Sequence, residues 1–405
     1  MAWIWTAAIS AITFLYLLLQ FLNLKNKKKL PPGPIGLPIL GHFHLLGKNP
    51  HQDLHRIAQK HGPIIYLQFG SVPTIIVSSP AAAELFLKTH DTVFADRPHH
   101  EASIYLGYEQ RNLIFGKYGQ YWRNMRKLCT MELLSNLKIS QFQTMRKTEL
   151  SLLVGLLKKA AETGETVDLS VRITNLSADM TCLMVFGKKY EERDLDEKGF
   201  KEVIKEVMEE AAAFNIGDYF PYLRGLDLQG SARRLKRLSK IFDGFLEKII
   251  DEHVKNKKEK ETQDFVDTMM GIMESGEAAF EFDRRHVKAV LMKARVLINA
   301  YAIGRDPSAW KDPEKFFPDR FYESNVDLRG RDFQLIPFGS GRRGCPGIQL
   351  GLTAVQLMVA QLVHCFDWGL PDGMMNNELD MSENFGLVVA RAKHLAAIPS
   401  YRLSH

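Results

Sequence analysis

The sequence predicts a mainly α-helical protein with small β-sheets, an α+β class, and three observations support this. Residues 138–279 repeat apolar side chains mostly at helical spacing. The clearest helical stretches there are Leu150–Leu157, Phe200–Phe214 and Ala232–Val254. Strand-like runs are short, and the two best, Ile64–Phe69 and Thr74–Val77, flank the turn Gly70–Ser71 as a hairpin would. A chain of 405 residues is long enough for one large domain or two modest ones.

Charge and cysteine usage narrow the possible classes of function. The net charge of +6 is mild and arises largely from local runs such as Lys255–Lys260, so it does not indicate nucleic-acid binding. The four cysteines, Cys129, Cys182, Cys345 and Cys365, show no paired spacing. This pattern favours a reducing compartment over a secreted, disulfide-linked framework.

The first 24 residues predict a membrane anchor. Trp3–Leu24 contains no charged residue, and about 22 residues of helix span about 33 Å, close to a bilayer core. Four lysines follow within residues 25–29 and favour the cytosol for that end. The alternative, a cleaved signal peptide, would have a shorter apolar core, basic residues before it and a small-residue cleavage site after it. We expect a single transmembrane helix at 1–24, a basic stop and proline-rich hinge at 25–41, and the body at 42–405.

Local patterns predict several further elements. Asp53–His61 is typical of a short amphipathic helix, and Pro80–Thr89 of a helix with proline in its first turn. Residues 99–118 are irregular and rich in glycine, tyrosine and polar side chains, whereas Gly119–Leu134 predicts another helix. Ala396–Arg402 predicts a final strand.

The stretch Phe338–Gly347 carries the strongest chemical signal. It places Cys345 in a glycine-rich loop beside Arg342 and Arg343, ahead of a helix-like run that reaches Cys365. Basic side chains and backbone N–H groups favour a thiolate there, and a thiolate can ligate a metal. Three interpretations compete: a buried structural cysteine at a turn, haem ligation by the thiolate, and a dinucleotide-binding loop.

The dinucleotide interpretation has one motif in its favour. Gly339–Gly344 satisfies G-x-G-x-x-G, and Asp367 follows roughly twenty residues later. Pro337, however, interrupts the strand that should precede such a loop, and the motif belongs at the start of a βαβ unit. The loop alone leaves the structural-cysteine and haem interpretations close to equal.

The spaced pattern Phe338-x-x-Gly341-x-Arg343-x-Cys345-x-Gly347 resembles the haem-binding signature of the cytochrome P-450 superfamily, the haem-thiolate monooxygenases. The resemblance implies that Cys345 is the metal ligand, that Arg343 pairs with a haem propionate and that Phe338 shields the sulfur from water. Gly341 and Gly347 would let the backbone approach the ring closely and turn without steric penalty.

Other segments resemble plant microsomal members of the same superfamily. Pro31–Gly41 is similar to their hinge, Phe94–Pro98 to a family landmark and Asn384–Val389 to the loop that closes the pocket. Trp122 and Arg126 lie four residues apart, hence on one helical face, and resemble the pair that binds the haem propionates. Without that resemblance, a core tryptophan and a surface arginine would be the simpler interpretation.

One part of the family pattern is missing. His286–Met292 resembles the first turns of the long central helix, yet Lys293–Ala302 follows at once and resembles a strand that the family places well after that helix. No Ala/Gly-Gly-x-Asp/Glu-Thr motif occurs, so the family's proton-delivering acid–threonine pair is absent and we identify no catalytic residue. The chain is also about a hundred residues short for the family. We predict an internal deletion at the 292/293 junction and an incomplete fold of this type.

The missing stretch should also carry a Glu-x-x-Arg pair. Glu281–Arg284 has these letters but precedes the central helix, so we reject it. Arg320, within Phe317–Phe321, matches the arginine that usually partners the pair, and it would lack its ion-pair network. An unpaired, partly buried guanidinium would cost on the order of several kcal/mol.

The resemblance implies an endoplasmic-reticulum membrane enzyme whose body faces the cytosol. It would bind haem b, take electrons from NADPH through an NADPH-cytochrome reductase, and insert one atom of dioxygen into a small apolar substrate of plant specialised metabolism. Membrane lipid would be a further partner and nucleic acid would not. The deletion favours an alternative for this particular chain: a catalytically inactive product of a skipped coding segment or a faulty gene model, with weak or no haem binding.

Overall fold

The computed structural model describes Trp3 and residues 30–190, 200–255, 263–275, 295–322 and 324–403. Four segments singled out in the sequence lie wholly or mostly outside these residues: the expected anchor (1–24), the basic stop at 25–29, Glu281–Arg284 and His286–Met292. The chain divides into two compact units, each assembled from three segments. Unit 1 comprises residues 1–98, 216–225 and 289–344, and unit 2 comprises residues 99–215, 226–288 and 345–405.

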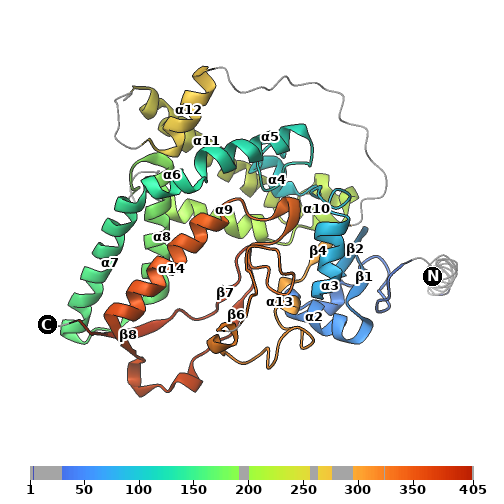
Figure 1. Cartoon of the computed structure of the whole chain (residues 1–405). Coiled ribbons are helices and arrows are strands. Elements are labelled where there is room, and N and C mark those ends of the chain that lie inside the picture. The colour runs from blue at the N-terminus through green and yellow to red at the C-terminus, as the bar shows by residue number, and fades with distance from the viewer. Residues whose placement is uncertain are drawn as a thin grey trace. The chain divides into compact units, whose positions relative to one another are not determined.

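The elements of unit 1 are, in chain order (Figure 1), η2 (Phe43–Leu45), α2 (Pro50–His61), β1 (Ile64–Phe69), β2 (Val72–Val77), α3 (Pro80–Glu84), η3 (Leu85–Thr89), α10 (Ile216–Tyr219), β4 (Arg295–Ile298), α13 (Ala300–Ile303), η7 (Pro318–Phe321) and η8 (Gly341–Arg343). The turn η6 (Pro221–Leu226) runs across the boundary between the units. The helices of unit 2 are α4 (Glu101–Tyr105), α5 (Gln120–Leu128), η4 (Cys129–Leu133), α6 (Asn136–Gln141), α7 (Gln143–Thr163), α8 (Leu169–Phe186), α9 (Phe200–Ala212), α11 (Ser231–Lys255), α12 (Phe265–Ser275), α14 (Ile348–Cys365), η9 (Pro371–Gly373) and η10 (Asn376–Glu378). Its strands are β3 (Val167–Asp168), β5 (Phe366–Gly369), β6 (Glu383–Asn384), β7 (Ala390–Arg391) and β8 (Ala396–Tyr401).

Unit 1 forms its core on a three-stranded sheet in the order β1–β2–β4. β1 and β2 make the predicted antiparallel hairpin, and β4 adds a parallel strand beside β2. Side chains of the sheet are buried against α2, α3 and Ile303 of α13; they include Ile65, Leu67, Ile76 and Val77. The strand expected over Lys293–Ala302 is shorter than predicted, because the Asn299 side chain accepts the N–H of Ala302 and caps the helical turn α13.

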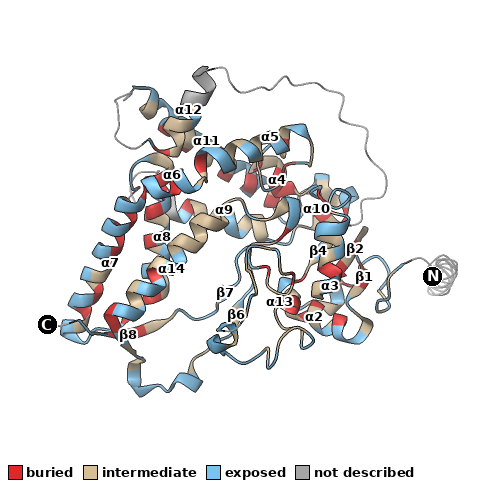
Figure 2. Cartoon of the chain, in the orientation of Figure 1, coloured by how far each residue is buried: buried red, intermediate tan, exposed pale blue. Residues whose placement is uncertain are grey.

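Unit 2 is mainly helical, as the sequence predicts. Its largest core cluster joins α7, α8 and α14 to the sheet β3–β8–β5. Helix α7 buries Leu150, Leu153, Leu157 and Ala160 at spacings of three and four residues, and buried positions recur along it in Figure 2. The other predicted helices are confirmed, with α5 and α3 each continued by a π-helical turn, η4 and η3. The predicted final strand is β8.

Arg320 corrects one expectation. Within the described part of the chain no carboxylate pairs with it, yet its guanidinium is not left unsatisfied. It donates to four backbone carbonyls, of Phe317 (3.1 Å), Lys311 (2.6 Å), Asp312 (3.0 Å) and Lys315 (2.8 Å). The expected penalty of an unpaired guanidinium therefore does not arise, because the turns before η7 supply the acceptors.

Helix α14 has two contrasting faces. Among the described residues it is the one helix long and apolar enough, by length and composition, to cross a membrane. Met358 and Cys365 lie in the core cluster of unit 2, which makes α14 a helix of that core. The other face exposes Val355, Val359 and Val363, four residues apart and 52, 52 and 60% accessible; we call these three the valine stripe.

Leu157→Ala should strongly destabilise unit 2. The Leu157 side chain is fully buried on α7, so its removal leaves a cavity and should lower the free energy of unfolding by about 2–5 kcal/mol. Leu152→Ala on the same helix is the matched control, because Leu152 is 59% exposed and its loss should change stability by less than about 0.5 kcal/mol. Urea denaturation followed by circular dichroism measures both, and equal effects would contradict this core.

Candidate functional site

The cysteine loop Phe338–Gly347 is fixed on its unit 1 side by close backbone contacts. Ser340 is buried and donates from Oγ to the carbonyl of Gly330 at 2.5 Å. Gly341 has φ +66°, and a Cβ placed there would collide with the carbonyl oxygen of Leu87. Both the left-handed conformation and the close approach require glycine. Gly341 thus has a structural reason for its identity, separate from the role that the family signature gives it.

Both arginines of the loop make contacts within unit 1. Arg343 is half-buried, and its Nε donates to the carbonyl of Ala95 at 2.6 Å. That carbonyl belongs to Phe94–Pro98, so two segments that resemble the same family meet here. Arg342 forms an ion pair with Asp91, with Nε 2.7 Å from Oδ2. Phe338, also in unit 1, is half-buried.

Cys345 belongs to unit 2 and precedes the first residue of α14, Ile348, by three positions. Gly347 is the N-cap of that helix. The partial positive charge at a helix N-terminus favours an anionic sulfur. Cys345 is exposed, so the interpretation as a buried structural cysteine is wrong. The dinucleotide interpretation is wrong as well, because no strand leads into Gly339 in the structure.

Arg126 of α5 supplies positive charge near this sulfur. Its guanidinium is half-buried; burial lowers the pKa of Arg126, and the charge of Cys345 opposes that shift. The guanidinium also lies over the indole of Trp122, 5.4 Å from the ring centroid. Cys345 and Arg126 therefore lie within electrostatic range of each other in unit 2.

The Trp122 side chain, unlike that of Arg126, already has a hydrogen-bond partner in the core. It is buried, and its Nε1–H donates to the carbonyl of Leu113 at 3.0 Å. The indole N–H would have to give up this bond in order to reach a carboxylate. The simpler interpretation, a core tryptophan, accounts for Trp122, whereas Arg126 is the member of the pair that interacts with Cys345.

The residues on the sulfur side fit a haem-thiolate site. An accessible thiol at a helix N-terminus, with a guanidinium in electrostatic range, is a suitable donor set for an axial thiolate with a charged partner nearby. The loop contacts to Gly330, Leu87 and Ala95 were not foreseen from the sequence. They involve backbone carbonyls, which every residue has, so no residue type marks them.

Comparison with known proteins adds two findings. The family model described as cytochrome P-450 matches residues 31–294 and 292–396, in two blocks that meet at 292–294. Similar curated proteins include cytochrome P-450 CYP736A12 of Panax ginseng, 40% identical over 478 aligned residues that cover 94% of this chain and 95% of that protein. Others are phenylacetaldehyde oxime monooxygenase CYP71AN24 of Prunus mume (32% identical, covering 93% and 90%) and germacrene A hydroxylase of Saussurea costus (32% identical, covering 98% and 99%).

The alignment with the ginseng protein is longer than the part of this chain that it covers. About a hundred of its 478 positions have no counterpart among the 405 residues here.

Gly341→Ala should destabilise the loop more than the same change at a comparable glycine. Gly373 has nearly the same φ, +69°, but a Cβ there would meet nothing within 4 Å. We expect Gly373→Ala to lower the free energy of unfolding by about 1–2 kcal/mol for the left-handed backbone alone. Gly341→Ala should cost clearly more because its Cβ meets Leu87. Denaturant titration compares the two, and equal losses would show that the Leu87 contact is unimportant.

Arg126→Gln should slow the alkylation of Cys345 at pH 7.5. The thiolate is the reacting form, and removal of a nearby positive charge disfavours it, so a fall of about two- to fivefold in rate is expected. Arg123→Gln on the same helix is the control and should leave the rate unchanged. Mass spectrometry of the Cys345 peptide after timed iodoacetamide treatment gives the rates; a slower reaction in both variants, or in neither, would contradict a specific pairing.

Proposed function

The chain belongs to the cytochrome P-450 family, and from this premise we propose that Cys345 would bind the iron of haem b as a thiolate. The observation that carries the proposal is the accessible Cys345 sulfur at the start of α14, interacting with Arg126. Haem, when bound, supplies dioxygen activation, which a thiolate ligand favours. The chain's residues would hold and enclose it: Cys345 binds the metal, Arg126 and Arg343 neutralise propionates, and Phe338 excludes water from the sulfur.

The family's reaction would insert one atom of dioxygen into a small apolar molecule. NADPH would provide the electrons through a reductase at the endoplasmic-reticulum membrane. The predicted anchor at 1–24 and hinge at 25–41 would hold the body, residues 42–405, on the cytosolic side. Relatives named for phenylacetaldehyde oxime and germacrene A support a small organic substrate of plant specialised metabolism.

A second candidate concerns this 405-residue chain itself: a family member that does not complete the reaction. The meeting of the two matched blocks at 292–294 supports a deletion at the 292/293 junction, and the ginseng alignment supports its length. The valine stripe of α14 supports it too, because an exposed apolar stripe is typical of a face that another segment covers. Without the acid–threonine pair, no identified residue of this chain would supply the protons that the family's reaction needs. We therefore propose that the family's chemistry is not completed by this chain.

The chain expressed with a haem precursor should give little or no haem absorbance, and no product with NADPH and reductase. A restored chain, with the residues that CYP736A12 carries between the two matched blocks inserted between Met292 and Lys293, should gain the ferrous–CO band of a thiolate haem. Cys345→Ala in the restored chain should abolish that band.

Two results would overturn these proposals separately. A stable ferrous–CO band and NADPH-dependent product from the unmodified 405-residue chain would refute its inactivity. An unchanged spectrum after Cys345→Ala in the restored chain would refute the axial ligand. A transcript that encodes additional residues between Met292 and Lys293 would support the deletion independently of expression.

A further inference from the structure

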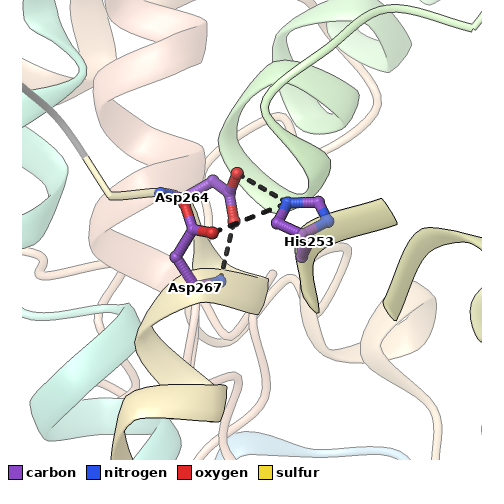
Figure 3. A group of neighbouring side chains, drawn as sticks. All are labelled: His253, Asp264 and Asp267. Atoms are coloured by element: carbon purple, nitrogen blue, oxygen red, sulfur yellow. Dashed lines mark hydrogen bonds and ion pairs between the residues drawn. The ribbon is translucent and has the colours of Figure 1, made fainter. Parts of the chain in front are cut away.

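Three ionisable side chains converge in unit 2 where α12 begins (Figure 3). His253 lies in the last turn of α11, Asp264 directly precedes α12 and Asp267 lies in its first turn. His253 Nε2 is 2.9 Å from Asp264 Oδ2 and 3.9 Å from Asp267 Oδ1. One possible ligand atom from each residue lies within 4.8 Å of the other two. The His253 and Asp264 side chains are only 7 and 3% accessible, so water screens their charges little, whereas the Asp267 side chain is 21% accessible.

The hydrogen bond at the other ring nitrogen of His253, Nδ1, determines whether Nε2 carries a hydrogen or a lone pair. Nδ1 lies 2.8 Å from the carbonyl oxygen of Ile249, which can only accept, so Nδ1 carries a hydrogen. In a neutral imidazole Nε2 then directs a lone pair at the two carboxylates. That arrangement is repulsive unless a cation, either a proton or a metal ion, lies among the three groups. Histidines that ligate metals ordinarily donate their second N–H to a carbonyl in this way.

Each aspartate uses one oxygen to cap α12 and turns the other toward His253. Asp264 Oδ1 accepts the N–H of Asp267 at 2.9 Å, and Asp267 Oδ2 accepts the N–H of Asp264 at 3.3 Å. These reciprocal bonds fix both side chains. The oxygens nearest His253 are the other two, Asp264 Oδ2 and Asp267 Oδ1.

The spacing suits a small divalent cation. Zinc bonds of about 2.0–2.2 Å to imidazole nitrogen and carboxylate oxygen place tetrahedral ligand atoms about 3.3 Å apart. The two distances from His253 Nε2, 2.9 and 3.9 Å, lie on either side of that value. A mixed nitrogen and oxygen set of three ligands favours a zinc-type ion over calcium or magnesium, which prefer oxygen ligands.

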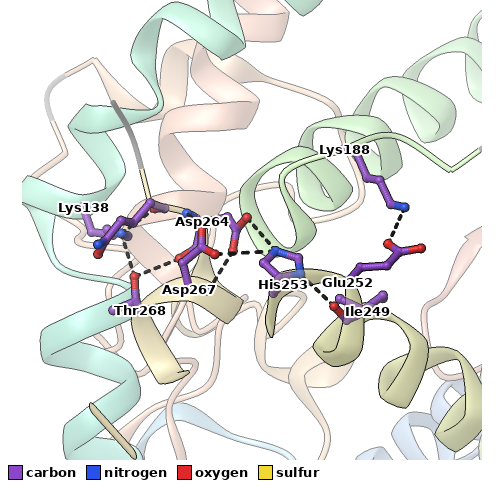
Figure 4. Close-up of polar contacts among 9 residues, drawn as sticks. Lys138, Lys188, Ile249, Glu252, His253, Asp264, Asp267 and Thr268 are labelled. Carbon is purple, nitrogen blue, oxygen red and sulfur yellow. Dashed lines mark hydrogen bonds and ion pairs between the residues drawn. The ribbon is translucent and has the colours of Figure 1, made fainter. Parts of the chain in front are cut away.

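Among the described residues, two lysines drawn near the group, Lys138 and Lys188, make hydrogen bonds or ion pairs outside it (Figure 4). Lys138 Nζ donates to the carbonyl of Gln263 at 2.7 Å and to Thr268 Oγ1 at 2.9 Å. Burial lowers the pKa of Lys138, and the charges of Asp264, Asp267 and Glu132 oppose that shift. Lys188 pairs with Glu252 at 2.6 Å. Lys138 therefore balances part of the negative charge from outside the three-residue group.

We propose that His253 Nε2, Asp264 Oδ2 and Asp267 Oδ1 bind one zinc-type divalent cation that joins the end of α11 to the start of α12. The fourth position is left for water or another donor. The competing occupant is a proton on Nε2, which would make the group an imidazolium–carboxylate ion pair. This site is independent of the haem proposal, because it uses none of the same residues.

The test is zinc binding to the purified full chain. A Cys345→Ser background removes the exposed thiol, which would itself bind zinc. After treatment with EDTA, titration with ZnCl₂ against a chromophoric chelator should give one site per chain. His253→Gln should weaken this site at least tenfold. His394→Ala is the matched control, because His394 lies 2.8 Å from Asp168 in an exposed pair with one carboxylate, and it should not alter the stoichiometry.

Two further measurements keep the proposal open to refutation. Zinc should raise the melting temperature of the Cys345→Ser chain but not that of its His253→Gln variant. Asp267→Asn, which preserves side-chain shape, replaces His253→Gln if the latter fails to fold, and circular dichroism without metal checks both. Equal zinc affinity in the folded His253 or Asp267 variant, or no saturable binding to the folded Cys345→Ser chain, would overturn the proposal and leave the proton as occupant.

Discussion

The accessible thiol of Cys345 at the N-terminal end of α14 is the constraint on which the proposed chemistry depends. On one side, Ser340 and Gly341 fix the loop against backbone carbonyls of unit 1. After Cys345 in the chain, helix α14 is held in unit 2 because its Met358 side chain lies in the core of that unit. The helix terminus and the guanidinium of Arg126 place positive charge near the sulfur. A metal ion that binds the sulfur would take it as the thiolate.

The two donors predicted for haem carboxylates are not equivalent. Trp122 already has a hydrogen bond to the carbonyl of Leu113, which contributes about 0.5–1.5 kcal/mol net, and that bond would be exchanged rather than gained. Arg126 is half-buried and stacked over the indole, so its side chain is positioned and it retains a full charge. A bond from a guanidinium to a carboxylate is roughly twice as strong as a neutral one. If the proposed haem is bound, Arg126 is therefore the stronger propionate donor of the two, and Trp122 supports its guanidinium through the ring contact.

Local patterns in the sequence predicted local structure well. The β1–β2 hairpin and α7 follow from turn residues and from the spacing of apolar side chains, which are properties of short windows. The parallel pairing of β4 with β2 could not be predicted in this way, because it joins segments more than two hundred residues apart. Arg320 shows the same limit. Residue types could not predict the carbonyl acceptors that its guanidinium uses, since backbone groups are common to all residues. The sequence does not indicate the group around His253, because its three side chains become neighbours only once α11 and α12 pack.

The position of the junction determines what a deletion there removes. Each unit's core is built from residues on both sides of it: Val77 and Ala83 pack with Ile303 and Phe333 in unit 1, and Leu157 with Phe366 in unit 2. Residues 295–298 still extend the sheet of unit 1 directly after the junction. The contacts that define both cores therefore form without any residue of the proposed missing stretch. If that stretch carries the acid–threonine pair, as the family pattern implies, its loss acts on proton delivery before it acts on the cores.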